Sequence, residues 1–451
     1  MKSMFKKILI ANRGEIAVRV IRACRDMGIV SAAVYSEADR QALHSQLADE
    51  SVCIGPAPSR DSYLNMNQII SAALALKADA IHPGYGYLSE NADFAELCAE
   101  HGITFIGPSP EALRLLGDKA QAIDTARKAG APVVPGSNGA LPDLAAARAC
   151  AGEIGFPLML KAAAGGGGRG IRLLRAMDEL ESAFTTASEE AKSFFGDGRM
   201  YMERYIEHPR HIEFQILGDQ HGTVIHLGER ECSLQRRHQK VLEEAPSPFL
   251  TPAKRAEMGA AAVKIAKAAG YYGAGTIEFL VGADGSFYFM EMNPRIQVEH
   301  PVTEYITGVD LVSAQIRVAL GEPLGFVQDD VTIKGHAMEC RVNAEDPDAG
   351  FAPRPGTING LHVPGGPGVR VDAAIYQGYT VPPFYDSLLA KLIVHGCDRD
   401  EALARMKRAM AEFLFEGIIT NCDFHLRLLE HEGFKSGDYS VDTIGEMMQE
   451  G

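Results

Sequence analysis

The sequence predicts an α/β and α+β multidomain protein: a doubly wound parallel-sheet domain, then a small glycine-rich unit, then a mixed carboxyl-terminal region. Three observations support this fold class. Strand-like and helix-like segments alternate over the first hundred residues, a run of four glycines separates two short strands, and strand-like segments predominate from about residue 207. The length of 451 residues fits about three domains.

The first domain begins with a predicted strand at 7–12 and a helix at 13–28, which places Ile16, Val20 and Cys24 on one side. The following elements are strands at 31–36, 78–86 and 103–110 and a helix at 90–102. This alternation is typical of βαβ units in a parallel sheet. The first turn, NRGE, has one glycine where a dinucleotide-binding fingerprint needs three, which argues against NAD.

The remaining elements divide the chain further. We expect a first domain over 1–118, a helical connector over 119–135, a small unit over 136–206 and a strand-rich region over 207–451, with a last subdomain at about 335–445. The small unit combines helices at 144–155 and 178–195 with strands at 157–163, 170–176 and 199–206. Further strands are expected at 211–219, 222–231, 276–293, 336–347 and 388–396, and a long helix at 398–417.

Composition excludes several classes of protein. Lys plus Arg total 44 against 59 Asp plus Glu, a net charge of −15, which argues against nucleic acid or an anionic membrane as the main partner. The eight cysteines form no CxxC pair, so neither a zinc ribbon nor a redox dithiol is indicated. No apolar window approaches 18 residues, and the first residues lack the apolar region of a signal peptide. We therefore expect a soluble cytoplasmic protein.

The glycine run at 165–168 follows a strand that ends near Lys161. Glycines let backbone N–H groups approach phosphates closely, and the chain has no GxxxxGK[ST] string of the Walker A type. A solvent-exposed loop is the alternative, but four consecutive glycines are entropically costly to order. The run is therefore interpreted as a β-hairpin flap over a triphosphate, with Lys161 supplying positive charge.

The segment 276–293 predicts a β-hairpin about an Asp-Gly turn at 284–285. Folding at this turn places Glu278 opposite Glu291, to within about one residue. Two adjacent carboxylates repel unless a cation or a proton lies between them, and with Asn293 the all-oxygen set suits Mg²⁺ or Mn²⁺. A carboxylate pair that shares a proton is the alternative.

A polar row at period two, from Glu291 to Glu299, continues from this hairpin. A solvated edge strand is one interpretation. An ideal strand would separate the Cα atoms of Arg295 and Glu299 by about 13 Å, too far for both to contact one small anion, so a bend is expected after Asn293. The segment 230–246 adds Arg236, Arg237, His238 and Lys240, as a charged surface loop or as cations beside a phosphoryl group.

Together these motifs closely resemble the biotin carboxylases of the ATP-grasp superfamily, nearly from end to end. The motifs that carry the resemblance are ANRGEIA, HPGYGYLSEN, KAAAGGGGRGIR, RHIEFQ, ERECSLQRRHQK, EMNPRIQVEHPVTE, ECRVNAEDP and GYTVPPFYDSLLAKL. The resemblance implies an ATP-grasp fold with a Rossmann-like amino-terminal domain and a mobile lid. It also implies a ligase in which ATP phosphorylates bicarbonate to carboxyphosphate, whose CO₂ then carboxylates N1′ of biotin.

The resemblance also implies roles for particular residues. It implies an ATP site formed by Lys119, Lys161, Gly165, Gly166, Gly167, Gly168, Glu203, Arg204, Ile206, His211, Gln235, His238, Leu280 and Val441. Implied metal ligands are Glu278, Glu291 and Asn293. The implied site for bicarbonate and biotin consists of Tyr85, Lys240, Arg295, Gln297, Val298, Glu299 and Arg341, with Glu299 as general base and Arg341 as the group that stabilises the biotin enolate. Arg204 stands where many members have lysine.

The cofactors implied are ATP and Mg²⁺ or Mn²⁺, with biotin as a carrier-bound substrate. Because the chain contains no transferase or biotinyl segment, we expect a separate homodimeric subunit that acts with a biotin carboxyl carrier protein and carboxyltransferase subunits, most specifically in acetyl-CoA carboxylase and fatty acid synthesis. Alternatives are a subunit of another acyl-CoA or 2-oxo acid carboxylase, or an ATP-grasp carboxylate–amine ligase. A non-catalytic scaffold would be expected to lack some of Lys240, Arg295, Glu299 and Arg341, and all four are present.

Overall fold

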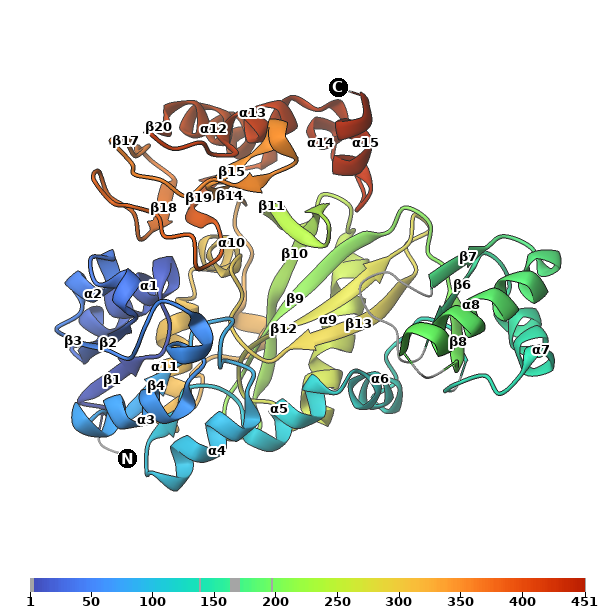
Figure 1. Cartoon of the computed structure of the whole chain (residues 1–451), viewed down its shortest axis with the longest axis horizontal. Helices are drawn as coiled ribbons and strands as arrows, with labels where there is room; N and C mark the ends of the chain where they lie inside the picture. Colours follow the sequence, from blue (N-terminus) through green and yellow to red (C-terminus); the bar gives the residue numbers. More distant parts are fainter. Residues whose placement is uncertain (1–3, 138, 163–170, 196–197, 451) are drawn as a thin grey trace. The chain divides into compact units, whose positions relative to one another are not determined.

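The computed structural model describes residues 4–137, 139–162, 171–195 and 198–450 (Figure 1). The chain divides into two compact units. The first contains Met1–Ala131, Arg210–Phe279 and Glu291–Gly451, and the second contains Pro132–Pro209 and Leu280–Met290.

The first unit opens with a five-stranded parallel sheet in the order β3-β2-β1-β4-β5. Its strands are β1 (Lys7–Ile10), β2 (Val30–Tyr35), β3 (Glu50–Cys53), β4 (Ala80–His82) and β5 (Thr104–Phe105), and its helices include α1 (Gly14–Asp26), α2 (Leu43–Leu47), α3 (Met66–Ala75) and α4 (Ala92–Glu100). Ile8 and Ile10 pack in one apolar cluster with α1, whereas Leu9 packs in another with α3 and α4. Helices therefore cover both faces of the sheet, which confirms the doubly wound prediction.

A sheet of eight strands follows, in the order β13-β12-β9-β10-β11-β14-β19-β18. The strands are β9 (Arg210–Gly218), β10 (Val224–Arg236), β11 (Gln239–Ala245), β12 (Gly273–Val281), β13 (Phe287–Asn293), β14 (His336–Asn343), β18 (Val369–Ala373) and β19 (Leu388–Gly396). The predicted hairpin of β12 and β13 is present, and Gly285, with φ 77°, donates its N–H to the Gly282 carbonyl in the turn.

The segment 230–246 differs from the charged surface loop considered above, because most of it forms the paired strands β10 and β11. Leu234, Val241 and Leu242 are buried in the carboxyl-terminal core, which holds both strands in place. Within 230–246, the exposed residues are Arg237 and His238, which form the turn at positive φ, and Gln239, the first residue of β11.

Helices pack on both faces of this sheet. Alternate residues of β14 face opposite sides: Met338 and Cys340 pack in the core that includes α12 (Arg399–Glu412), whereas Ala337 packs with Val302 of α10 (His300–Thr307). The other helices of the unit are α5 (Pro110–Gly117), α6 (Lys119–Lys128), α9 (Pro252–Ala268), α11 (Leu311–Ala319), α13 (Cys422–Glu430), α14 (Glu432–Ser436) and α15 (Thr443–Glu450). Two further pairs of short strands are β15 (Glu345–Asp346) with β16 (Ala352–Pro353) and β17 (Gly360–His362) with β20 (Leu414–Glu416). No helix within the described ranges is long and apolar enough to cross a membrane.

The second unit has a three-stranded antiparallel sheet in the order β7-β6-β8. Its elements are α7 (Leu144–Ile154), β6 (Leu158–Ala162), β7 (Ile171–Leu174), α8 (Leu180–Phe195) and β8 (Met200–Arg204). Leu158, Leu160 and Met202 form its core with apolar residues of both helices. The predicted flap at Gly165, Gly166, Gly167 and Gly168 lies outside the described residues.

Candidate active site

Glu299 lies at the centre of the buried polar cluster in the first unit. β13 ends at Asn293, and the chain continues without strand structure until α10 begins directly after Glu299. The bend predicted after Asn293 is therefore confirmed. The Glu299 side chain is 2% exposed and lies at the amino-terminal end of α10, where the helix dipole favours a negative charge.

Two cations from neighbouring strands hold the two oxygens of this carboxylate. Lys240 of β11 donates to Glu299 Oε1 at 2.6 Å, and Arg341 of β14 donates from Nη2 to Oε2 at 2.8 Å. β11 pairs with β14, so both side chains reach Glu299 from adjacent strands. Arg341 also donates from Nε to Glu243 Oε1 at 2.6 Å. The resulting cluster can place an ionised carboxylate beside two groups that bind anions.

A second layer of buried charges supports Lys240. Its ammonium lies 2.5 Å from Glu213 Oε2 and 3.3 Å from Glu278 Oε1. Glu213 is paired across β9 and β10 with Arg230, whose Nε donates to Glu213 Oε1 at 2.6 Å. The other guanidinium nitrogens of Arg230 donate to Gln215, Thr276, Gln297 and Thr303. Arg230 is completely buried and fully hydrogen-bonded, so it holds the cluster together without facing a ligand.

Neighbouring charges determine the protonation states of Glu299 and Lys240. Burial raises the pKa of Glu299, but Lys240 and Arg341 outweigh it and hold that pKa well below its ordinary value. Burial lowers the pKa of Lys240, but the acidic groups around it, Glu213, Glu278 and Glu299 among them, raise it well above the ordinary value. At neutral pH the cluster therefore contains ionised Glu299 between ionised Lys240 and ionised Arg341.

Two of the three predicted metal ligands, Glu278 and Asn293, are in contact beside this cluster, and the charge of Glu278 acts on the third, Glu291. Glu278 accepts hydrogen bonds from Asn293 Nδ2 at 2.8 Å and Gln297 Nε2 at 2.9 Å, and its Oε2 lies 2.9 Å from His211 Nε2. Partial desolvation and the negative charge of Glu278 raise the pKa of Glu291. Two carboxylates that repel each other, together with an amide oxygen, are a donor set that fits a hard divalent cation.

The remaining residues of the 291–299 row point in different directions. Arg295 donates from Nε to Glu90 at 2.5 Å and from Nη2 to Asn293 Oδ1 at 3.0 Å, rather than contacting Glu299. Gln297 bridges Glu278 and Arg230. The Val298 carbonyl accepts a hydrogen bond from the buried Lys391 at 2.8 Å.

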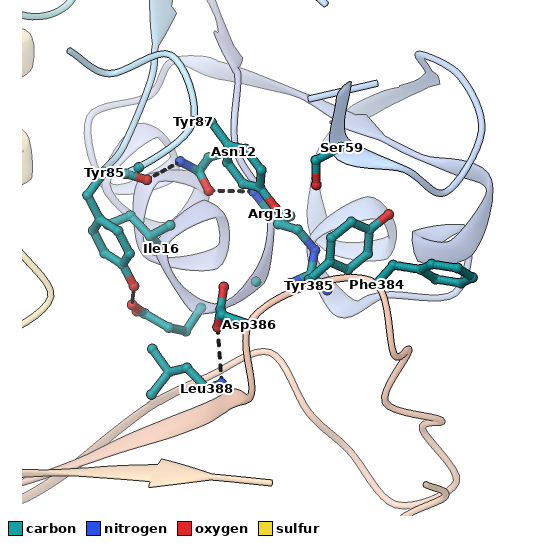
Figure 2. A pocket seen from close by; sticks show the side chains of 13 residues that line it. Asn12, Arg13, Ile16, Ser59, Tyr85, Tyr87, Phe384, Tyr385, Asp386 and Leu388 are labelled. Atoms are coloured by element: carbon teal, nitrogen blue, oxygen red, sulfur yellow. Dashed lines mark hydrogen bonds between the residues drawn. The ribbon is translucent and has the colours of Figure 1, made fainter. Parts of the chain in front are cut away.

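Tyr85 lines a cavity of about 360 Å³ between the first sheet and the segment that precedes β19 (Figure 2). Its wall includes Arg13, Tyr87, Tyr385 and Asp386, and Figure 2 shows their side chains around the opening. The Tyr85 hydroxyl donates to Glu15, which lies 3.2 Å from Lys391 Nζ. Through Lys391 and the Val298 carbonyl, a chain of polar contacts therefore connects this cavity with the residue beside Glu299.

The other predicted nucleotide-site residues are distributed over both units. In the second unit, Lys161 of β6 forms an ion pair with Glu203 of β8, and Arg204 donates to the Ile154 carbonyl at 2.5 Å. Ile206 and Leu280 belong to this unit as well. In the first unit, Gln235 Nε2 lies 2.7 Å from His211 Nδ1, and Lys119 is the first residue of α6. His238 lies in the turn between β10 and β11, and Val441 lies just before α15.

The sequence interpretation missed Glu213, Arg230, Glu243 and Lys391. One signal was available for Glu213, because the polar Glu213 and Gln215 alternate with Ile212, Phe214 and Ile216 along β9. No comparable local signal marks the other three.

Comparisons with known proteins cover nearly the whole chain. Residues 4–113 match the family described as "Biotin carboxylase, N-terminal domain", residues 118–327 match "Carbamoyl-phosphate synthase L chain, ATP binding domain", and residues 339–446 match "Biotin carboxylase C-terminal domain". A biotin carboxylase of Nostoc sp. is 59% identical over 443 residues, which are 98% of this chain and 99% of that protein. A pyruvate carboxylase subunit from Methanothermobacter thermautotrophicus is 54% identical, over 98% of this chain and 90% of that protein.

A solved structure shows the same fold with ligands. The biotin carboxylase domain dimer of Hydrogenobacter thermophilus 2-oxoglutarate carboxylase, in complex with MgADP, ADP and bicarbonate, matches with a TM-score of 0.88 and 51% identity. The match covers 98% of each chain.

Proposed function

The chain belongs to the biotin carboxylase family, and from this premise we propose that Glu299, Lys240 and Arg341 carry out the ATP-dependent carboxylation of biotin by bicarbonate. The enzyme is an ATP-grasp ligase that uses ATP, Mg²⁺ and biotin. The observation that carries the assignment of roles is the placement of both cations on one buried carboxylate, at 2.6 and 2.8 Å.

In the first step, Glu299 accepts the proton of bicarbonate, and the bicarbonate oxygen attacks the γ-phosphorus of ATP. The products are carboxyphosphate and ADP. Lys240, Arg295, Gln297 and the Val298 backbone are the proposed bicarbonate site, because Lys240 contacts Glu299 and the other three come from the segment that leads to it.

Binding of bicarbonate changes the proton affinity of Glu299. Glu299 clamped between two cations is a weak base, because they stabilise its ionised form. An incoming bicarbonate competes for Lys240 and Arg341 and so weakens their hold on Glu299. The proton affinity of Glu299 therefore rises when the substrate that must lose a proton is in place.

In the second step, carboxyphosphate breaks down to CO₂ and phosphate, the released phosphate accepts the proton of biotin N1′, and a C–N bond forms between N1′ and CO₂. Negative charge develops on the ureido oxygen of biotin, and the Arg341 guanidinium stabilises it. We assign Tyr85 and its cavity to the biotin side of the site, because the Glu15–Lys391–Val298 contacts connect them to the base.

The nucleotide and metal assignments follow the residues predicted from the sequence. We assign ATP to Lys119, Lys161, the 165–168 glycines, Glu203, Arg204, Ile206, His211, Gln235, His238, Leu280 and Val441. Glu278, Glu291 and Asn293 would hold Mg²⁺, which when bound neutralises charge on the phosphates. The proposed domains are those expected from the sequence. They are an amino-terminal domain at 1–118, a connector at 119–135, a lid domain at 136–206, and an ATP-grasp core with the carboxyl-terminal subdomain at 207–451.

The proposed biological setting is a cytoplasmic homodimer that carboxylates biotin on a carrier protein and works with carboxyltransferase subunits. Acetyl-CoA carboxylase is the preferred complex. The relatives from pyruvate carboxylase and 2-oxoglutarate carboxylase support a 2-oxo acid carboxylase as the alternative.

A purified sample tests the activity directly. We expect ATP hydrolysis to require Mg²⁺, bicarbonate and biotin together, with each single omission reducing ADP release to background. ADP release that needs an amine substrate and is indifferent to biotin would instead support the carboxylate–amine ligase alternative.

A further inference from the structure

Glu339 of β14 is a completely buried carboxyl group whose two oxygens have no hydrogen-bond partner in the described part of the chain. It lies on the face of the sheet that α10 covers, where Ala337, Ile393 and Val302 form an apolar cluster. Buried polar groups in folded proteins nearly always have partners, so a carboxyl group with none needs an explanation. An ionised carboxylate would be strongly disfavoured at such a position.

A second carboxyl group lies opposite Glu339 in the same sheet. Glu243 of β11 and Glu339 are directly paired Cα positions in the antiparallel ladder. Side chains at such positions share one face of the sheet, with Cβ atoms about 5 Å apart. Glu243 Oε1 accepts from Arg341, whereas Glu243 Oε2 has no partner among the described residues.

The cations near this pair form their hydrogen bonds with groups other than Glu339. Arg341 donates hydrogen bonds to Glu243 and Glu299. It also acts electrostatically on Glu339, the third acid near it. Lys391, on the neighbouring strand β19, is directed to the Val298 carbonyl and to Glu15. Within the described residues, neither Arg341 nor Lys240 nor Lys391 donates a hydrogen bond to Glu339, and a bound proton removes the charge that would need one.

We propose that Glu339 is a positioning residue that stays protonated and uncharged, and thereby leaves Arg341 to be shared between Glu243 and Glu299. An ionised Glu339 would compete for the guanidinium and draw it from the position in which it meets the developing charge on biotin. The proposal rests on the function assigned to Arg341 above.

The electrostatics of the pair agree with this assignment. Burial, and then the neighbouring Glu243, raise the pKa of Glu339 well above its ordinary value, against the opposing effect of Lys391. Burial also raises the pKa of Glu243 to about 7, even though Arg341 opposes the change. The other charged groups that act on Glu339 are Arg341, which opposes the rise in its pKa, and Glu299, which stays ionised and adds to the rise.

The chain offers a matched control in Glu244, the next residue of β11. It is also completely buried, but it accepts hydrogen bonds from His336 at 2.6 Å, Arg399 at 2.7 Å and Tyr439 at 2.5 Å. Burial raises the pKa of Glu244, but His336 and Arg399 outweigh this and lower it to about 2, so this acid is ionised in the folded protein. Glu244→Gln therefore replaces an ionised acid with an uncharged side chain, whereas Glu339→Gln replaces an acid that is already uncharged.

The test compares Glu339→Gln with Glu244→Gln in the full-length protein. Wild type must keep a proton on Glu339 that the unfolded chain releases above the ordinary pKa of 4.5, so folding becomes less favourable as pH rises. Glu339→Gln has no such proton, and its melting temperature relative to wild type should rise between about pH 5 and pH 8. Glu244→Gln should melt below wild type throughout that range, because Arg399 loses its ionised partner.

Kinetics give the functional readout. Glu339→Gln should keep kcat and the KM for biotin within about threefold of wild type at pH 7 and should retain activity to higher pH, because it cannot gain charge there. A melting temperature that falls like that of Glu244→Gln, or a kcat loss above about tenfold at pH 7, would show that the charge of Glu339 is needed and would overturn the proposal.

If Glu339→Gln does not fold, the same melting measurements are made on Glu339→Met. This variant also replaces the acid with an uncharged side chain of similar length. Failure of both uncharged variants to fold would contradict the proposal, and folding of either with the expected stability profile would support it. The melting measurements require no activity. A protein that shows the expected stability profile but does not carboxylate biotin would therefore disprove the proposed function and leave the protonation of Glu339 standing.

Discussion

Glu299→Gln is expected to lower the rate of biotin carboxylation by about 100- to 10,000-fold, the range that general-base catalysis supplies. The amide keeps the shape of the side chain but cannot accept the proton of bicarbonate. It also leaves Lys240 and Arg341 without the carboxylate that lies 2.6 and 2.8 Å from them. Initial rates of ADP release with saturating biotin and bicarbonate measure the effect.

Nucleotide binding is the internal control for this variant, because Glu299 is not among the residues assigned to ATP. The dissociation constant for ADP with Mg²⁺ should stay within about threefold of wild type. Glu322→Gln, the same change at an exposed position after α11, should leave both quantities unchanged. A Glu299→Gln enzyme with the turnover of wild type would remove this residue as the base.

Arg341→Met is expected to lower kcat by about 100- to 1,000-fold, which is the usual cost of removing one donor to a developing negative charge. The unbranched apolar side chain retains most of the volume but neither the charge nor the planar fork. Glu243 would lose the cation that holds its Oε1 at 2.6 Å, so the variant should also unfold more easily. Steady-state kinetics and thermal melting separate the two effects.

Arg341→Lys serves as the matched variant, because it keeps the charge but cannot bridge two carboxylates with a planar fork. We expect it to recover stability more completely than kcat. If Arg341→Met lost stability and kept the kcat of wild type, Arg341 would have only a structural role.

The fold was predictable where local pattern determines it. The apolar residues of β1 and the periodic α1 predicted the first βαβ unit, and the Asp-Gly turn predicted the hairpin of β12 and β13. The pairing of β11 with β14 was not predictable, because it joins residues nearly a hundred positions apart. No local pattern specifies which distant strand becomes a neighbour.

The same limit applies to the site. Glu299 and Arg341 could be named from the family motifs, but their contact depends on the β11–β14 pairing and on the bend after Asn293. Arg230 and Lys391 lie in segments where polar and apolar residues do not alternate regularly. Their roles depend on burial beside acidic residues of other elements, Glu213 for Arg230 and Glu15 for Lys391. Burial of charge is a tertiary property, so sequence pattern alone did not reveal it.

The central claim is that the cluster around Glu299 transfers the carbon of bicarbonate to biotin at the expense of ATP. The most direct measurement follows carbon-14 from labelled bicarbonate into acid-labile carboxybiotin while ADP is counted in the same sample. The account predicts that labelled carboxybiotin forms only with ATP and Mg²⁺ and that Glu299→Gln slows its formation by at least about 100-fold. ADP production without any labelled biotin, or equal labelling by wild type and Glu299→Gln, would contradict it.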